Sequence, residues 1–177
     1  MPQIQLFIAH SLDGFIAREN GALDWLENRP NPKGLDHGYA SFLEEIDSIL
    51  IGRATYEEIL GFGVDWPYPN CKTYVFTQQK DFRPSTANTQ VLHTISHKAI
   101  ADVKAAATKN IWALGGGKLI TALLNLGAVD EMTLTVIPVI LGKGIPLFPN
   151  NPLETELELI EAQSFETGAV NLKYAKK

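Results

Sequence analysis

Apolar positions along the chain follow either the period of a strand or that of a helix. Short stretches with Gly, Pro, Asn or Asp separate the segments that have these periods. Runs rich in β-branched and aromatic residues predict β-strands over residues 3–10, 15–17, 48–51, 72–77, 90–93, 110–114, 129–141, 156–166 and 170–175. Apolar residues spaced three or four positions apart predict helices over residues 54–60, 97–107 and 118–126. Tyr39, Phe42, Leu43 and Ile46 predict one more helix, which starts near Asp36 or Gly38.

The order of these elements predicts the fold class. Strands alternate with helices as far as residue 141, and the last two strands pair as a hairpin around Thr167 and Gly168. This order is typical of an α/β domain with a mainly parallel central sheet and an antiparallel C-terminal edge. Pro138, inside the run 129–141, predicts a bend or a sheet edge. The length and the lack of an internal repeat or linker predict a single domain over residues 1–177.

Composition and charge narrow the class of protein. Hydrophobic residues make up 45% and charged residues 20% of the chain, as in soluble globular proteins. The net charge of −5 is scattered and includes no basic stripe, so nucleic acid is not expected as a partner. No apolar run is long enough for a membrane span. Cys71 is the single cysteine, and the first residues lack the features of a signal peptide, so we expect a cytoplasmic protein.

The clearest binding motif is a strand, a glycine turn and a helix at residues 110–126. The turn itself, residues 115–118, reads GGGK. Glycines allow positive φ angles and close approach of a ligand, and the N-terminus of the next helix suits a pyrophosphate. A G-x-G-x-x-G fingerprint would need glycine at Ile120, and a phosphate loop would need Ser or Thr at Leu119. The turn is therefore either a phosphate cradle of another kind or only a tight connection.

Two other predicted strands end in polar or glycine turns. Residues 52–55 read GRAT, and Arg53 and Thr55 can both reach an anion from the first turn of the next helix. The alternative is a solvated arginine beside a helix-initiating threonine. The strand at 72–77 ends in the hydroxyl of Thr77, followed by two glutamine amides. Because ligands of parallel α/β sheets gather at the carboxyl ends of strands, the three turns predict one site for a long ligand.

Four motifs together resemble a known family. They are SLDGFIA at residues 11–17, IGRATYE at 51–57, LGGGKL at 114–119 and PVILGKGIPLF at 138–148. In this order they resemble the dihydrofolate reductase-like superfamily, and more closely the reductase domain of bacterial bifunctional deaminase-reductases of riboflavin synthesis. The resemblance covers nearly the whole chain. It implies a three-layer α/β/α fold of the dihydrofolate reductase type and a homodimer.

The resemblance implies NADPH as the hydride donor. The residues that it places along this cofactor are Ala9, Gly52, Arg53, Thr55, Thr77, Gln78, Leu114, Gly115, Gly116, Gly117, Lys118 and Leu119. Residues 52–55 would lie near the phosphates, and residues 115–119 along the pyrophosphate and the nicotinamide ribose. The backbone of Ala9 would meet the nicotinamide carboxamide. We expect a positive φ or a closely approaching phosphate at Gly116, so that Gly116→Val would abolish cofactor binding.

One part of the implied cofactor site departs from the family. Thr77 and Gln78 would hold the adenosine 2′-phosphate, where a basic residue often stands beside the hydroxyl in the family. Here Gln78 and Gln79 are neutral. That leaves Lys80 or Arg53 to supply the positive charge that would favour NADPH over NADH.

Two carboxylic acids are candidates for the catalytic proton source, either directly or through a water molecule. Asp13 follows the first strand, close to the expected nicotinamide; the alternative is a simple turn former. Asp36 stands where dihydrofolate reductases carry their pterin-binding acid. It is also placed to cap the helix that begins near His37.

The expected substrate is a small heterocycle. The resemblance favours 5-amino-6-(5-phosphoribosylamino)uracil, and the alternatives are dihydrofolate or an inactive protein that only binds NADPH. Aromatic residues around Asp36 are expected to line the substrate pocket: Trp25, Tyr39, Phe42 and Trp66. The zinc signature of deaminases is absent and the four histidines lack metal-ligand spacing, so we expect no metal and a reductase domain alone.

Overall fold

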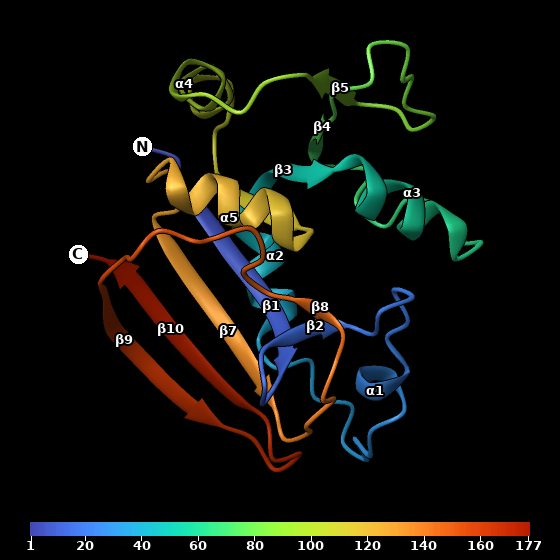
Figure 1. Cartoon of the computed structure of the whole chain (residues 1–177), viewed down its shortest axis with the longest axis vertical. Coiled ribbons are helices and arrows are strands. Elements are labelled where there is room, and N and C mark those ends of the chain that lie inside the picture. The colour runs from blue at the N-terminus through green and yellow to red at the C-terminus, as the bar shows by residue number, and fades with distance from the viewer.

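The computed structural model describes residues 1–177 and contains a central sheet of eight strands in the order β5-β4-β3-β6-β1-β7-β10-β9 (Figure 1). The strands are β1 (Ile4–Ser11), β3 (Ile46–Gly52), β4 (Lys72–Phe76), β5 (Thr89–Leu92), β6 (Asn110–Gly115), β7 (Glu131–Ile137), β9 (Leu157–Ser164) and β10 (Val170–Lys176). The strands from β5 to β7 in this order pair in parallel, and β10 pairs antiparallel with both β7 and β9. The predicted parallel sheet with an antiparallel C-terminal edge is therefore confirmed.

Helices cover both faces of this sheet. Figure 1 shows α5 (Gly117–Asn125) in front of the sheet and α2 (Tyr39–Glu44) behind it. Side chains of α4 (His97–Ala106) and α5 share one buried cluster with β1, β3, β4, β6 and β7. Side chains of α2 and α3 (Arg53–Gly61) pack on a second cluster, on the opposite face of β3, β4 and β6. The three-layer arrangement is confirmed, and no helix has both the length and the apolar character needed to span a bilayer.

Two predicted boundaries are wrong for identifiable reasons. Ile46 continues the helical spacing of α2, but α2 ends at Glu44 and Ile46 is the first, buried residue of β3. An apolar residue that enters a buried strand directly after a helix can extend the helical pattern by coincidence. The strand at 129–141 is shorter than predicted, because β7 ends at Ile137 and Pro138, which has no N–H for a ladder hydrogen bond, follows it.

Two short elements were not predicted. The helix α1 (Asp24–Glu27) has a single turn and buries Trp25. The strand β8 (Ile145–Pro146) pairs with β2 (Phe15–Ala17) in a separate two-stranded sheet. A side chain at Gly144 would collide with the carbonyl oxygen of Ala17, so glycine is required where these strands meet. Both elements are too short to leave a periodic signal in the sequence.

Asp47 anchors the loop that leads into β6. Its Oδ2 accepts hydrogen bonds from the N–H of Thr108 at 2.7 Å, the hydroxyl of Thr108 at 2.7 Å and the N–H of Lys109 at 2.8 Å. Burial raises the pKa of the Asp47 carboxyl, but these hydrogen bonds and one from Ser48 outweigh it, so the pKa lies below its usual value. The group is therefore ionised at neutral pH and stabilises the fold in that form.

We expect Asp47→Asn to lower the free energy of unfolding at pH 7 by about 1–3 kcal/mol, because one amide oxygen cannot replace the charged acceptor. A depressed pKa in the folded state stabilises the protein above the unfolded value of about 3.9 and ceases to do so as the pH falls through the folded value. The difference between the two proteins should therefore shrink below about pH 4. Urea unfolding at several pH values measures it, with the exposed Asp102→Asn as control. Equal stabilities at pH 7 would contradict the anchor.

Candidate functional site

Three of the predicted turns meet around one cavity of about 830 Å³ at the carboxyl edge of β3, β4 and β6. Nine of the residues predicted to bind the cofactor line this cavity: Gly52, Arg53, Thr55, Thr77, Gln78, Gly116, Gly117, Lys118 and Leu119. Parallel pairing explains the convergence, because it places the ends of neighbouring strands at the same edge of the sheet. The sequence therefore predicted which segments come together, although their role in binding stays a prediction.

The glycine turn after β6 is packed against the turn after β3. A Cβ atom at Gly52 would lie 3.8 Å from the backbone N of Gly116, and one at Gly116 would lie 2.9 Å from the hydroxyl oxygen of Thr55. The peptide bond between Gly115 and Gly116 is cis. The expected positive φ at Gly116 is wrong: its φ is −74°, and Gly115 has the positive value of 129°. Gly116 is thus constrained by the space around it rather than by its φ angle.

Two helix N-termini face this cavity without a capping side chain. The N-cap residues of α3 and α5 are Gly52 and Gly116, and neither helix has a side-chain capping hydrogen bond. In contrast, the hydroxyl of Ser96 caps α4 by accepting from the N–H of Ala99 at 3.2 Å. Uncapped N–H groups and the positive end of a helix dipole together attract anions. The arrangement can therefore hold a diphosphate between α3 and α5.

Positive charge in the cavity comes from two side chains. The guanidinium of Arg53 is paired with Glu57 on the next turn of α3, at 2.6 Å. Lys118 is exposed and forms no ion pair. Lys80, which the sequence offered as a second cation, does not line the cavity. Among the acidic residues of the lining, Glu58 has its carboxyl pKa raised by burial.

A second cavity of about 460 Å³ continues from the end of β4. It shares Thr77, Gln78 and Lys118 with the larger cavity and adds His93 and Ile95. The Nδ1 atom of His93 lies 2.8 Å from the carbonyl oxygen of Thr77, which ties the end of β5 to the end of β4. All other lining residues of the smaller cavity belong to the larger cavity as well, so the two cavities form one continuous site.

Three predicted cofactor residues lie outside the lining of both cavities. Ala9 is in β1 beside Thr135 of β7, and Leu114 and Gly115 end β6. Leu114 packs on the core cluster beneath α2 and α3. The structure therefore brings the phosphate-binding part of the prediction together, whereas contacts of these three residues with a cofactor stay predictions.

Asp13 fastens the first turn to the loop after β7. One of its oxygens accepts from the hydroxyl of Ser11 at 2.6 Å and from the N–H of Leu141 at 3.0 Å, and the other accepts from the N–H of Gly142 at 2.7 Å. The Ser11 hydroxyl in particular holds the pKa of the Asp13 carboxyl below its usual value. Asp13 is therefore ionised at neutral pH, and its geometry fits the turn-forming alternative better than that of a proton donor.

Asp36 binds the start of α2, but the N-cap residue of this helix is Gly38 rather than Asp36. Its carboxylate accepts from the N–H of Ala40 at 2.8 Å and from the N–H of Gly38 at 3.1 Å. These two hydrogen bonds, that of Ala40 first, lower the pKa of the Asp36 carboxyl. The side chain remains exposed, with acceptor capacity to spare. A catalytic role for Asp36 stays a prediction, and at neutral pH the group would act as a carboxylate.

The four aromatic residues predicted to line the substrate pocket are divided between two clusters. Tyr39, Phe42 and Trp66 belong to one aromatic group beneath α2 and α3, in which the hydroxyls of Tyr39 and Tyr68 lie 2.9 Å apart. Trp25 lies elsewhere and packs on Ile137. None of the four lines the cavity of 830 Å³. Their contact with a substrate stays a prediction.

Sequence reasoning missed a polar network on the α2 face of the sheet. The hydroxyl of Thr135 in β7 donates to Oδ1 of Asn171 in β10 at 2.7 Å, and Nδ2 of Asn171 donates to the carbonyl oxygen of His37 at 2.7 Å. Thr135 and Asn171 are both buried. The alternation of polar residues along 131–135 was the available signal, because it places them all on one face of a strand.

Comparisons with known proteins give one matching family and several proteins of similar structure. A family model described as the RibD C-terminal domain matches residues 2–171. The chain is 37% identical to "Uncharacterized protein YwjB" of Bacillus subtilis over 171 residues, which cover 97% of this chain and 96% of the relative. A solved structure from Shewanella sp. PV-4, named "Putative riboflavin biosynthesis protein", superposes with a TM-score of 0.90 at 30% identity and 99% coverage of both chains. Dihydrofolate reductase from Enterococcus faecalis, complexed with NADP(H), shares the fold, with a TM-score of 0.70, 20% identity, and coverage of 99% of this chain and 96% of that one.

Proposed function

The chain belongs to the RibD C-terminal domain family, and on that premise we propose that it is an NADPH-dependent reductase of a small heterocyclic substrate. The observation that carries the proposal is the cavity of about 830 Å³ at the carboxyl edge, where two uncapped helix N-termini meet across a glycine turn. Such a site suits the diphosphate of a dinucleotide, because free helix N–H groups and the positive ends of helix dipoles attract phosphate oxygens.

The residues around the cavity fit a nicotinamide dinucleotide. The turns at 52–55 and 116–118 would hold the diphosphate, and a side chain at Gly116 or Gly117 would occupy space that the ligand or its neighbours need. The adjoining cavity near His93 would take the adenosine end. When bound, the cofactor supplies the hydride. The fold match to dihydrofolate reductase complexed with NADP(H) supports this assignment.

In the proposed reaction, the residues of the chain bind and orient the substrate, and neither candidate carboxyl group is protonated to act as a proton donor. The carboxyls of Asp13 and Asp36 both have lowered pKa values, so each is ionised at neutral pH. Asp13 already accepts three hydrogen bonds, from Ser11 and from the loop after β7, whereas the exposed Asp36 accepts two and keeps more free lone pairs. We therefore assign to Asp36 the orientation of a substrate N–H or of the water molecule that delivers the proton.

The substrate class follows the family. We assign a pyrimidine of the 5-amino-6-(5-phosphoribosylamino)uracil type ahead of dihydrofolate. The family match over residues 2–171 supports this order, whereas the likeness to dihydrofolate reductase is one of fold. Oxidation of NADPH, followed by absorbance with each substrate in turn, separates the two. Turnover of dihydrofolate alone would make dihydrofolate the preferred substrate. Tight NADPH binding without turnover of either substrate would favour the alternative of an inactive protein that only binds NADPH.

We expect the protein to bind NADPH more tightly than NADH, and Lys118→Gln to lower that preference by about tenfold, because one charge-assisted contact to the 2′-phosphate is lost. Lys118 lines both cavities and has no carboxylate partner, whereas Arg53 is already paired with Glu57. Nicotinamide fluorescence during titration with each cofactor gives the two dissociation constants. Lys80→Gln is the matched control, since Lys80 lies outside both cavities. If Lys118→Gln keeps the preference for NADPH, Lys118 does not bind the 2′-phosphate. If the wild-type protein binds neither cofactor at millimolar concentration, the proposed function is overturned.

A further inference from the structure

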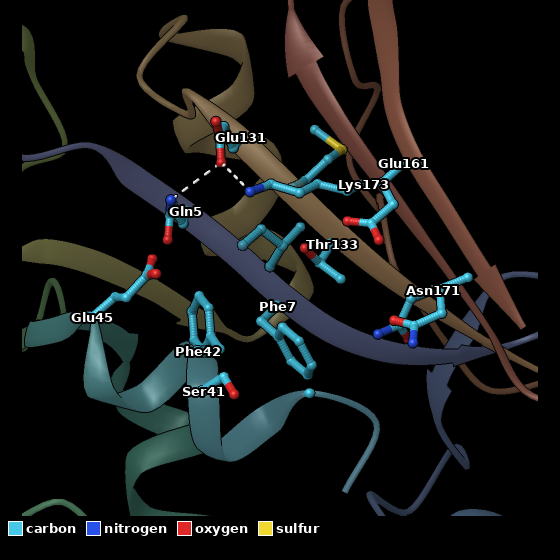
Figure 2. A pocket seen from close by; sticks show the side chains of 14 residues that line it. Gln5, Phe7, Ser41, Phe42, Glu45, Glu131, Thr133, Glu161, Asn171 and Lys173 are labelled. Atoms are coloured by element: carbon cyan, nitrogen blue, oxygen red, sulfur yellow. Dashed lines mark hydrogen bonds and ion pairs between the residues drawn. The ribbon is translucent and has the colours of Figure 1, made fainter. Parts of the chain in front are cut away.

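A separate polar cavity of about 250 Å³ lies on the face of the central sheet that α2 covers. Figure 2 shows it between α2, the first half of β1, and the strands β7, β10 and β9. Gln5 and Glu131 stand at the amino ends of β1 and β7, whereas the proposed cofactor cavity lies at the carboxyl ends of its strands. The two cavities share no lining residue. What this second cavity binds is therefore a question independent of the cofactor.

Negative charge is in excess in this cavity. Its lining contains the carboxylates of Glu45, Glu131 and Glu161 and one ammonium group, that of Lys173. Lys173 pairs with Glu131 at 2.9 Å, and this Glu131 side chain is only 19% exposed. Glu45 and Glu161 form no ion pair with any residue of the chain. Two carboxylates are thus left for a positively charged ligand.

The side-chain amide of Gln5 offers a free acceptor atom to the same cavity, because its oxygen is not sealed off from solvent. Gln5 is 7% exposed and uses its Nε2 to donate to Glu131 at 3.2 Å, while its amide oxygen accepts no hydrogen bond within the chain. Figure 2 shows this oxygen turned toward the carboxylate of Glu45. An amide between two carboxylates can turn its NH2 to only one of them, so in either orientation the other carboxylate faces an acceptor oxygen. A hydrogen-bond donor from outside the chain would satisfy both groups.

The spacing of the carboxylates and the aromatic wall of the cavity favour an organic cation over a metal ion. Nowhere in the chain do three His, Cys, Asp or Glu side chains come close enough to hold a metal ion, so the three carboxylates of this lining are too widely spaced for one. The rings of Phe7 and Phe42 are stacked, with centroids 4.9 Å apart, and form an apolar wall of the cavity. Aromatic faces attract ammonium and guanidinium groups and also pack against the carbon atoms that carry them.

We propose that this cavity binds a small organic cation with a primary ammonium or guanidinium group. The cationic group donates to the amide oxygen of Gln5 and to the carboxylate of Glu45, the carbon body lies against Phe7 and Phe42, and Glu161 takes a second positive charge. The cofactor of the proposed reductase does not enter this argument, and Phe42 is the one residue that this cavity shares with the predicted substrate pocket. Amine binding is therefore measured without cofactor or substrate present.

Isothermal titration calorimetry with agmatine and with putrescine tests the proposal on the full chain. We expect saturable binding at one site, weakened by added salt because the attraction is between charges. The uncharged 1,4-butanediol, which matches putrescine in length, should not bind. No saturable heat with either amine up to about 10 mM would overturn the proposal, since weaker affinity than that is worth less than about 3 kcal/mol.

Matched variants locate the site. Glu45→Gln should weaken agmatine binding by about tenfold, because a charge-assisted hydrogen bond becomes a neutral one. Glu44→Gln removes the same charge from the neighbouring position of α2, outside the cavity, and should leave the affinity within about twofold. Both positions are exposed, so thermal unfolding should show two folded proteins. Equal losses in the two variants would show a diffuse charge effect and would overturn the site.

Discussion

Replacing Gly116 with Val is expected to abolish cofactor binding in a chain that still folds. The Cβ atom of the new residue would lie 2.9 Å from the hydroxyl oxygen of Thr55, closer than unstrained carbon and oxygen atoms approach. Relief requires Thr55 to turn or the two turns to separate, and the two branches of valine extend further into the cavity. We expect the dissociation constant for NADPH to rise at least about 100-fold, beyond what loss of a single hydrogen bond explains.

Nicotinamide fluorescence measures this effect, and Gly61→Val is the matched control. Gly61 is the last residue of α3, is exposed, and has no atom within 4 Å of the position where a Cβ would stand. The same chemical change there should leave the affinity for NADPH unaltered. Equal affinities in a folded Gly116→Val protein and in the control would show that the glycine turn is only a connection between strand and helix.

Asn171→Leu is expected to cause the largest loss of stability among the polar substitutions considered. Asn171 is 9% exposed and joins β10 both to Thr135 of β7 and to the backbone of His37, just before α2. Leucine leaves a buried hydroxyl donor and a carbonyl acceptor without partners, which costs about 2–4 kcal/mol in all. For a chain of this size, the midpoint of thermal unfolding should fall by about 5–15 °C.

A double-mutant cycle separates this network from simple packing. Replacing both partners of a buried hydrogen bond costs less than replacing one, because no polar group is left alone. Thr135→Val should therefore cost less in the Asn171→Leu background than in the wild-type protein. Strictly additive free energies of unfolding would mean that Thr135 and Asn171 do not depend on each other.

The sequence predicted the sheet and most helices because their patterns are local. Strands such as residues 72–77 are dense in strand-forming residues, and α4 has both helical spacing and a capping serine. The predictions of secondary structure fail where tertiary contacts, rather than the local pattern, determine the structure. Ile46 fits a helical face but begins β3, where it is buried and pairs with Asn110 of β6. The strand β8 exists only because β2 lies beside it.

The sequence predicted which three turns form the candidate site, but not the backbone conformation of those turns. Parallel pairing alone places residues 52–55, 77–78 and 116–119 at one edge, and this follows from the order of the elements. The φ angle of Gly116 does not follow, because a run of three glycines does not say which one takes the positive value. The dimer and the contacts of Ala9 stay predictions for the same reason, since both depend on surfaces rather than on local pattern.

Partners distant in sequence account for what the sequence did not reveal. Asp36 fits both a cap and a catalytic acid in the sequence, and only the structure shows that it binds N–H groups at the start of α2, where Gly38 is the N-cap residue. Gln5, Glu45 and Glu131 are separated by up to 126 positions in the chain but line one cavity. No local period links them, so their shared site becomes visible only after the strands are paired.

A crystal structure of the chain grown with NADPH is the most direct test of the central claim, that the cavity at the carboxyl edge is a dinucleotide site. We predict the diphosphate between the turns at 52–55 and 116–118, the adenosine 2′-phosphate beside Lys118 and Thr77, and the nicotinamide near Ala9. Density for the cofactor at any other place on the protein, or an empty cavity at saturating NADPH, would contradict the account.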